Sequence, residues 1–311
     1  MIHICFEITS KAWGGANQFL KSLKNEFEKM GCYSDDLNEA KVILFNSHHN
    51  IEIVRKLKQE LPKDVKFFHR VDGPMKLYNS SDDQRDSIVS FLNDQVADAT
   101  IFQSNWSRQK CFQENICSEK KPHTVVYNAC DPNIFYPVDH KFSTFQAEIK
   151  LESHSPCKLV SASFSDNLKK GFHFYKQAES MIDFKEYEYY FLGRNTAVVF
   201  ENIKELGTKD SQGLSDILRK SDIYITASTN DPCSNSLIEA ISCKLPCLAY
   251  NSGGHTEIIK KTNGGLLFED LDDFKVKLDE LKNNYKKYRS NIKPFSMKEI
   301  ASQYLEFFKK N

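Results

Sequence analysis

Apolar and polar positions follow two periods along the chain, and the alternation between them predicts strands and helices in turn. Short apolar runs bounded by polar turns are typical of buried strands, whereas apolar residues three and four positions apart mark one face of a helix. In the first half the pattern predicts strands at 2–8, 41–45, 65–71, 99–103 and 124–127, and helices at 19–30, 51–60, 83–96 and 106–114. This half therefore reads as a parallel, doubly wound α/β domain.

A second alternation follows a polar segment. Residues 139–156 lack clear periodicity and any long apolar run, which predicts a linker between domains. Beyond it the pattern predicts strands at 158–163, 187–192, 222–226 and 246–250, and helices at 171–181, 213–221 and 234–242. The tail after Pro294 spaces Ile300, Tyr304 and Phe307 helically, so a last helix is expected to pack back on either domain.

The composition is that of a globular protein without overall charge. The 311 residues are 40% hydrophobic, enough for two cores, and 42 Lys and Arg balance 42 Asp and Glu. Zero net charge gives no general attraction to nucleic acid or anionic membrane. No membrane-spanning run and no secretory signal are evident, so a cytoplasmic protein is the simplest interpretation. The nine cysteines form no Cys-x-x-Cys pair, which favours neither disulfides nor a zinc site.

The segment 222–257 is the most informative part of the sequence, because it predicts a strand, an acidic turn, a helix, a second strand and a Gly-Gly turn. Asp231 precedes a helix start near Ser234, and Glu239 lies inside that helix. Two carboxylates would then flank backbone N–H groups that attract phosphate, and each carboxylate would accept hydrogen bonds from sugar hydroxyls. The alternative is a capping box, in which Ser236 and Glu239 only satisfy the helix's own N–H groups.

Further candidates lie in loops after predicted strands, where open α/β sheets bind ligands. Gly14 and Gly15 would let a phosphate approach the backbone, or would form a simple tight turn. They do not make the Gly-x-Gly-x-x-Gly pattern, and no Walker motif occurs, which disfavours NAD chemistry. His69 ends a predicted strand, either as a cleft contact or as a structural histidine. Lys169 and Lys170 close a strand-to-helix turn, where a lysine would neutralise phosphate or face solvent.

Together these motifs resemble the donor site of the family 4 retaining glycosyltransferases. DPCSNSLIEA followed by LPCLAYNSGGHTE is similar to the family signature of two glutamates separated by seven residues, with Glu239 at the second position and Asp231 at the first. The likeness continues in order through FHRVDGP, ADATIFQSNWSR, VVYNACDPNIFYP, SFSDNLKKGFHFY and FLGRN. It implies the GT-B fold, with two Rossmann-like, doubly wound parallel-sheet domains facing across a cleft.

The implied domains are an acceptor-side domain at 1–145, a nucleotide-sugar domain at 146–295 and a helix at 296–311 that packs on the first domain. The implied activity is that of a hexosyltransferase-like enzyme of glycan biosynthesis, which moves a sugar from a nucleotide-diphosphate sugar to an acceptor hydroxyl with retention of configuration. No metal or other cofactor is expected. The catalytic residues that the resemblance implies are His69, Asp231 and Lys170. The donor-binding residues that it implies are Gly14, Gly15, Ser165, Asn167, Arg194, Asn195, Cys233, Ser234, Asn235 and Glu239.

Two departures from the family pattern leave alternatives open. Asp231 is one methylene shorter than the usual glutamate, and the usual arginine ahead of Lys170 is missing, so a non-catalytic nucleotide-sugar-binding protein stays as an alternative. Within the enzymes, the alternative is a GT-B nucleotide-sugar epimerase or hydrolase. The acceptor is expected to be a glycan, a lipid-linked molecule or a small molecule, not a nucleic acid. The lysine-rich stretch 275–293 is interpreted as a solvated helix face, with weak peripheral contact at the inner membrane face as the alternative.

Overall fold

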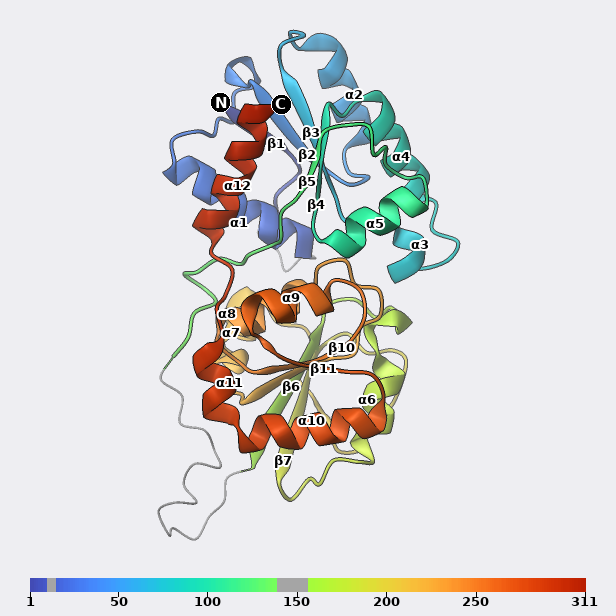
Figure 1. Cartoon of the computed structure of the whole chain (residues 1–311), viewed down its shortest axis with the longest axis vertical. Coiled ribbons are helices and arrows are strands. Elements are labelled where there is room, and N and C mark those ends of the chain that lie inside the picture. Colours follow the sequence, from blue (N-terminus) through green and yellow to red (C-terminus); the bar gives the residue numbers. More distant parts are fainter. Residues whose placement is uncertain (10–14, 139–155) are drawn as a thin grey trace. The chain divides into compact units, whose positions relative to one another are not determined.

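The computed structural model describes residues 1–9, 15–138 and 156–311, which divide into two compact units (Figure 1). Unit 1 comprises Met1–Ala129 and Ser296–Asn311, and unit 2 comprises Cys130–Phe295. Unit 2 thus begins ahead of residue 145, where the sequence pattern predicts the first domain to end. Most of the predicted linker, residues 139–155, lies outside the described residues, as does Gly14.

Unit 1 is a parallel sheet with helices in its crossover connections. Its elements in chain order are β1 Ile2–Cys5, α1 Gly15–Lys29, η1 Leu37–Glu39, β2 Val42–Asn46, α2 Ile51–Glu60, β3 Lys66–Val71, α3 Met75–Tyr78, α4 Arg85–Gln95, β4 Ala99–Phe102, α5 Asn105–Gln113, β5 His123–Val125 and α12 Met297–Lys310. The strands pair in the order β1-β2-β3-β4-β5, all parallel, so their carboxyl ends meet at one sheet edge.

The final helix belongs to unit 1. It runs alongside α1 (Figure 1), and its aromatic side chains enter the core between that helix and the sheet. The ring of Phe308 lies 4.5 Å from that of Phe68 on β3, and the Tyr304 ring lies 6.4 Å from that of Phe27 on α1. Burial of such large rings stabilises the docked helix by several kcal/mol, roughly 1.5–3 for each ring.

Unit 2 is also a parallel sheet with helices in its connections, but it has one more strand and a different strand order. Its elements are β6 Cys157–Ser163, η3 Leu168–Lys170, α6 Phe172–Glu179, β7 Tyr187–Gly193, β8 Lys204–Glu205, α7 Ser211–Leu218, β9 Ile223–Thr226, α8 Asn235–Ser242, β10 Cys247–Tyr250, α9 His255–Thr262, β11 Gly265–Phe268, α10 Leu271–Asn283 and α11 Tyr285–Asn291. The strand order is β11-β10-β9-β6-β7-β8, so the direction of winding reverses between β6 and β9. Ligands of doubly wound sheets bind outside the carboxyl ends of the strands at such a reversal.

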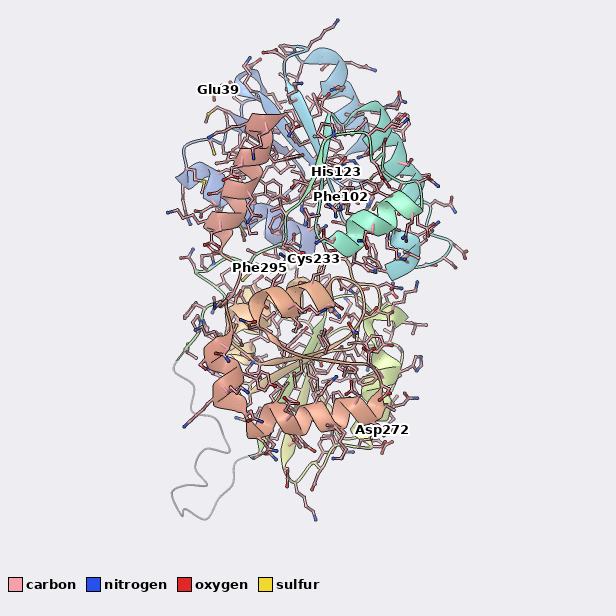
Figure 2. All side chains as sticks on the ribbon, in the orientation of Figure 1. Glu39, Phe102, His123, Cys233, Asp272 and Phe295 are labelled. Carbon is pink, nitrogen blue, oxygen red and sulfur yellow. The ribbon has the colours of Figure 1, made fainter. Side chains whose placement is uncertain are left out.

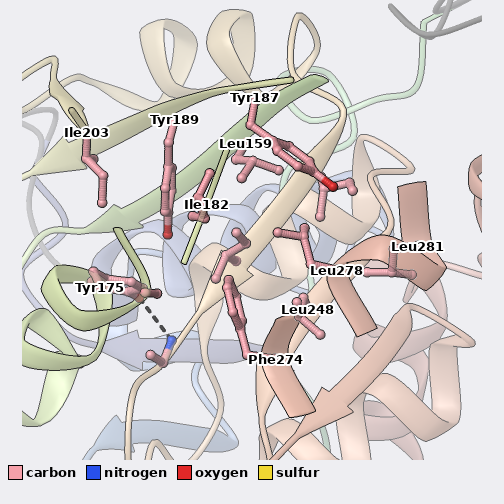
Figure 3. Close-up of a cluster of buried hydrophobic side chains, with 14 of the residues drawn as sticks. Leu159, Tyr175, Ile182, Tyr187, Tyr189, Ile203, Leu248, Phe274, Leu278 and Leu281 are labelled. Atoms are coloured by element: carbon pink, nitrogen blue, oxygen red, sulfur yellow. Dashed lines mark hydrogen bonds between the residues drawn. The ribbon is translucent and has the colours of Figure 1, made fainter. Parts of the chain in front are cut away.

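The core of unit 2 also fixes the strand end next to this reversal (Figure 3). The hydroxyl of Tyr175 on α6 accepts the backbone N–H of Ala227 at 3.0 Å, directly after β9. The Ser161 hydroxyl of β6 donates to the Ile225 carbonyl at 2.7 Å. These buried polar atoms are satisfied inside an aromatic core, so the loop that follows β9 starts from a fixed position.

The α/β fold class is confirmed, and the predicted strands and helices agree with the structure to within a few residues. The prediction was incomplete for residues 251–295. There the sequence pattern indicated only a solvated helix face, whereas the structure has α9, β11, α10 and α11. Several lysines of that face are paired, since Lys277 contacts Asp273 at 2.7 Å and Lys282 contacts Glu186 at 2.5 Å. None of the helices that the structure describes is long and apolar enough to cross a bilayer.

One buried carboxylate organises the chain ahead of β8. Glu179, at the end of α6, accepts the backbone N–H groups of Glu201 and Ile203 at 2.8 Å each, and that of Asn202, while Lys176 lies 3.0 Å from its second oxygen. Burial opposes ionisation of Glu179, but these donors outweigh it and hold the carboxyl pKa below its ordinary value. Its stabilising effect is therefore complete above pH of about 4.3 and is lost as the pH falls through the lowered pKa.

We expect Glu179→Ala to lower the free energy of unfolding by about 1–3 kcal/mol at pH 7, because it leaves buried N–H groups without an acceptor. Urea unfolding at pH 7 measures the change. The control is Glu201→Ala, whose carboxylate is 75% exposed and contacts the same lysine, and it should change the free energy by no more than about 0.5 kcal/mol. Equal effects of the two substitutions would contradict the role assigned to Glu179.

Candidate functional site

The loops after β6 and β9 are joined by backbone and side-chain bonds at the reversal of the unit 2 sheet. The Thr229 N–H donates to the Lys169 carbonyl at 2.8 Å. One residue further along η3, the Lys170 ammonium donates to Asp231 Oδ2 at 2.8 Å. Gly171 permits this approach, because its φ is +88° and a Cβ there would lie 2.5 Å from the Ala227 carbonyl oxygen. Lys170 and Asp231, which were predicted separately as site residues, are thus in contact.

Asp231 is held as an ionised carboxylate. Its other oxygen accepts the Cys233 N–H at 3.2 Å, and the residue is only 8% exposed. Burial opposes ionisation, yet Lys170 and His255 together hold the pKa of Asp231 below its ordinary value. The pair therefore presents a fixed ammonium and a fixed carboxylate within one partly buried ion pair.

The Gly-Gly turn after β10 closes on the same loop. The Gly254 N–H donates to the Asp231 carbonyl at 2.8 Å, and the Asn230 N–H donates to the Ser252 hydroxyl at 2.9 Å. A Cβ on Gly253 would lie 2.4 Å from the Asp231 carbonyl oxygen, and the φ of Gly253 is +62°. Three neighbouring strands therefore contribute loops that lock the backbone around Asp231.

Helix α8 begins without a side-chain cap. Ser234 occupies the N-cap position but makes no cap hydrogen bond, and its hydroxyl lies 3.3 Å from that of Ser236. Asn235 is the first helical residue, and Cys233 precedes the helix in the loop, where Figure 2 labels it. The capping-box alternative is wrong, because Ser236 lies inside the helix and does not cap it. The first-turn amides retain the character of an anion-binding helix start.

Glu239 lies inside α8, buried and without a donor. It is 8% exposed, and no N–H or O–H group in the described part of the chain donates to its carboxylate. Burial raises the pKa of this carboxyl to about 8. Buried carboxylates are normally paired or hydrogen-bonded, so an unsatisfied one beside an open helix start points to a ligand that supplies the donors.

The other predicted donor-binding residues line the neighbouring loops. Ser165 and Asn167 lead into η3, where the Asn167 side chain caps the Lys169 N–H at 2.9 Å and the Ser165 hydroxyl accepts the Asn167 N–H at 3.2 Å. Arg194 follows β7, and its guanidinium lies 5.0 Å from the centre of the Phe164 ring. Phe164 was not predicted, although it directly follows β6 and is 39% exposed.

Asn195 has a structural role in this arrangement. Its side-chain nitrogen donates to the Val198 carbonyl at 2.8 Å and to Glu205 at 2.9 Å, while its oxygen accepts the Ala197 N–H at 3.1 Å. These contacts occupy the amide group on both sides. Asn195 thus shapes the loop beside Arg194 through the hydrogen bonds of its side-chain amide.

His69 does not have the position that its sequence context predicts. It lies within β3 with no exposed surface; its Nε2 donates to the Ser47 carbonyl at 2.9 Å, and its Nδ1 accepts from Asn93 at 3.3 Å. Burial lowers the imidazole pKa to about 3. The prediction of a cleft-facing catalytic histidine is corrected to a neutral structural histidine in the core of unit 1. Gly15, also in unit 1, is the first residue of α1.

His255 is a polar group that the motif analysis missed. It follows the Gly-Gly turn, is fully buried and donates through Nδ1 to the Tyr250 carbonyl at 3.1 Å. Its Nε2 is buried and meets no hydrogen-bond partner among the described residues. Burial lowers the His255 pKa, against the opposing effect of nearby Asp231. Within the same described residues, no group of three His, Cys, Asp or Glu side chains is arranged to hold a metal ion.

Comparison with known proteins finds a family model that matches part of unit 2. Residues 197–296, which include α7 to α11, match the family model of the glycosyl transferases group 1. A curated relative, the probable sucrose-phosphate synthase of Thermosipho melanesiensis, is 26% identical over 205 residues, or 60% of this chain and 47% of that protein. The chain therefore spans about half the length of this curated relative.

Solved structures show that the whole chain has the GT-B fold. The sucrose-phosphate synthase of Thermosynechococcus elongatus superposes with a TM-score of 0.72 at 13% identity, covering 99% of this chain and 98% of that one. Anabaena HepE, in complex with UDP and glucose, gives a TM-score of 0.67 at 14% identity, covering 96% and 84%. The predicted GT-B fold is confirmed, and the match of residues 197–296 supports the predicted resemblance to glycosyltransferases.

We expect Gly253→Ala to destabilise unit 2 by about 1–3 kcal/mol more than Gly207→Ala, because a side chain at 253 meets backbone that cannot move without displacing Asp231. Gly207 is a matched control, since its φ of +65° is almost that of Gly253 but nothing lies within 4 Å of its Cβ position. Urea unfolding of both variants measures the difference. Equal losses of unfolding free energy in the two variants would show that the close approach of the Gly-Gly turn to Asp231 does not contribute to stability.

Proposed function

We propose that this chain is a group 1 glycosyltransferase, supported by the match of residues 197–296. It moves a sugar from a nucleotide-diphosphate sugar to an acceptor hydroxyl, with retention of anomeric configuration and without a metal ion. The observation that carries this proposal is the contrast between two carboxylates on one loop and helix. Asp231 is satisfied by Lys170, whereas Glu239 is buried without a donor.

Glu239 is the residue that holds the nucleoside. A carboxylate accepts two hydrogen bonds from the vicinal hydroxyls of a ribose, and a desolvated carboxylate gains more from them than an exposed one. Because burial raises the pKa of Glu239 to about 8, its charged form is disfavoured until a ligand supplies those donors. Ribose hydroxyls would therefore complete an unsatisfied group that the fold already positions.

The diphosphate binds between Lys170 and the start of α8. Cleavage of the sugar–phosphate bond develops negative charge on the departing oxygen, and preorganised donors aimed at that oxygen stabilise the transition state. The Lys170 ammonium and the backbone amides near Cys233, Ser234 and Asn235 supply such donors. They provide the positive potential that the leaving group requires from the protein itself.

Asp231 contacts the transferred sugar. Its ion pair with Lys170 places it beside the phosphate site, and its backbone is locked by the Gly-Gly turn. Its shorter side chain selects which sugar hydroxyls are reached. For retention, the acceptor hydroxyl attacks the anomeric carbon from the face that the diphosphate leaves, and its proton passes to the departing phosphate oxygen. We assign no protein nucleophile to this step.

UDP is the first nucleotide to test, because HepE, which shares the fold, has been solved with UDP and glucose. Titration calorimetry with UDP, UDP-glucose and UDP-N-acetylglucosamine tests donor binding, and mass spectrometry with mono- and disaccharide acceptors tests transfer, each with and without EDTA. Rapid donor consumption without acceptor would select a hydrolase or epimerase. Binding without any turnover would select a non-catalytic protein, and activity lost in EDTA would overturn the metal-free mechanism.

We expect Glu239→Ala to weaken nucleotide binding on the order of 100-fold, since two hydrogen bonds to a charged group are removed. Calorimetry with the nucleotide that binds the wild type measures the loss. Undiminished affinity would remove Glu239 from the site.

The Glu239→Gln variant tests whether the carboxyl is buried, through the pH dependence of the free energy of unfolding. In the wild type the folded state retains a proton that the unfolded state loses, so stability falls as the pH rises from about 4.3 through 8. The glutamine variant lacks this loss. Its free energy of unfolding relative to wild type should therefore increase between pH 5 and pH 8.5, and a constant difference would mean that the carboxyl is not desolvated.

We expect Lys170→Met to lower the turnover of the donor by about 100-fold or more, because it removes a cation from the departing diphosphate. The neighbouring Lys169→Met is the matched control and should keep most of the activity. The backbone carbonyl of Lys169 accepts the Thr229 N–H, and the substitution leaves this bond in place. Steady-state kinetics with the preferred donor compare the two. A similar loss in both variants would show that the two lysines share the phosphate.

A further inference from the structure

A buried arginine ties together the carboxyl ends of three strands in unit 1. Arg70 on β3 has no exposed surface, and its guanidinium donates to Asn46 at the end of β2 and to Asn128 beyond β5, the latter at 2.7 Å. It also contacts Asp72 Oδ1 at 3.2 Å. The face of the guanidinium lies 4.5 Å from the ring centre of Phe19 on α1. The network occupies the sheet edge at which open α/β sheets bind ligands.

Asp72 is the member of this network that reaches the surface. Its side chain is 21% exposed, while Arg70 is completely buried. Arg70 and Gln103 both donate to Oδ1, and Gln103 in turn accepts from Asn128 at 2.9 Å. Within the described residues, no group donates to Asp72 Oδ2. One oxygen is thus held by two buried side chains, and the other is left to accept hydrogen bonds from outside.

Stability alone does not account for this arrangement. Taking an arginine out of water costs several kcal/mol, and well-packed apolar residues often replace such an ion pair with no loss. The network is also incomplete, because the Nε of Arg70 is buried and meets no acceptor in the described part of the chain. What the network does provide is a carboxylate of fixed direction.

The local charges favour an uncharged ligand. The positive charge of Arg70 is matched by Asp72, and Arg85 nearby is paired with Asp83. The His48 ring interacts electrostatically with Asp72, Asp83 and Arg85. It is neutral at pH 7 because burial lowers its pKa to about 4. No excess positive charge is thus offered to a phosphate, whereas a free carboxylate oxygen suits hydroxyl donors.

We propose that Asp72 binds the hydroxyl groups of an uncharged carbohydrate acceptor and that Arg70 is the positioning residue that fixes its carboxylate. The acceptor role rests on the proposed function, while the hydroxyl site itself stands on the geometry of unit 1. Asp72 Oδ2 accepts hydrogen bonds from the acceptor, and no bond is made or broken at this residue.

Saturation-transfer NMR on the full chain tests the site with D-glucose, D-fructose and D-mannose, each beside its 6-phosphate. The wild type is expected to bind at least one of the neutral sugars and to prefer it to its phosphate. Asp72→Asn keeps the shape but removes the charge, and should weaken that binding at least tenfold. Asp82→Asn, an exposed aspartate of the same unit, is the matched control and should leave binding unchanged.

Arg70→Lys tests the positioning role. A lysine keeps the charge but cannot reach Asn46, Asp72 and Asn128 with one planar group, so sugar binding should weaken although Asp72 is intact. In a transfer assay both variants should raise the KM for acceptor more than they lower kcat, and UDP affinity by calorimetry should stay unchanged. A merely structural role would lower the unfolding temperature without this split.

Three results would overturn the proposal: no neutral sugar binds the wild type, the 6-phosphates bind in preference, or Asp72→Asn binds as the wild type does. Failure of the donor site is separate, because it would appear as a wild type that does not bind UDP in calorimetry. Binding of neutral sugars to unit 1 is measured by NMR and does not depend on UDP binding.

Discussion

The ion pair between Lys170 and Asp231 is the interaction on which the proposed donor site depends. It forms where the winding of the unit 2 sheet reverses, and it joins two loops whose backbones are already linked through Lys169 and Thr229. The aromatic core fixes one end of this arrangement at Ala227, and the Gly-Gly turn fixes the other. Core packing therefore determines the geometry of a charged pair that lies at the edge of the sheet.

Each unit places incompletely satisfied polar groups at the carboxyl ends of its strands or in the helix that follows. In unit 2 these are Glu239 and the Nε2 of His255, and in unit 1 they are Arg70 Nε and one oxygen of Asp72. A fold selected only for stability would pair such groups or replace them with apolar side chains. In each unit these groups lie near the carboxyl ends of the strands, where open α/β sheets bind ligands.

Much of the fold could be predicted because apolar runs and helical stripes are local signals, and α2 begins and ends where its pattern predicts. The buried side of α10 was not predicted although Phe274, Leu278 and Leu281 have helical spacing, since the many charges of 275–293 suggested only a solvated helix face. His69 was misplaced because β3 continues to Val71, and because its partners, Ser47 and Asn93, are distant in sequence. Local periodicity does not reveal such partners.

In the proposed donor site, the buried carboxyl of Glu239 would discriminate against ligands that lack one of the two hydroxyls. In the unliganded protein burial favours the protonated form of Glu239. The free energy needed to ionise this carboxyl therefore lowers the affinity for every ligand by the same amount. A ligand with two suitably placed hydroxyls compensates that cost, whereas a ligand lacking one of them leaves a desolvated oxygen unpaired. Sites built this way discriminate more strongly than apolar pockets of the same size, because the penalty for a missing hydroxyl exceeds the value of an added contact.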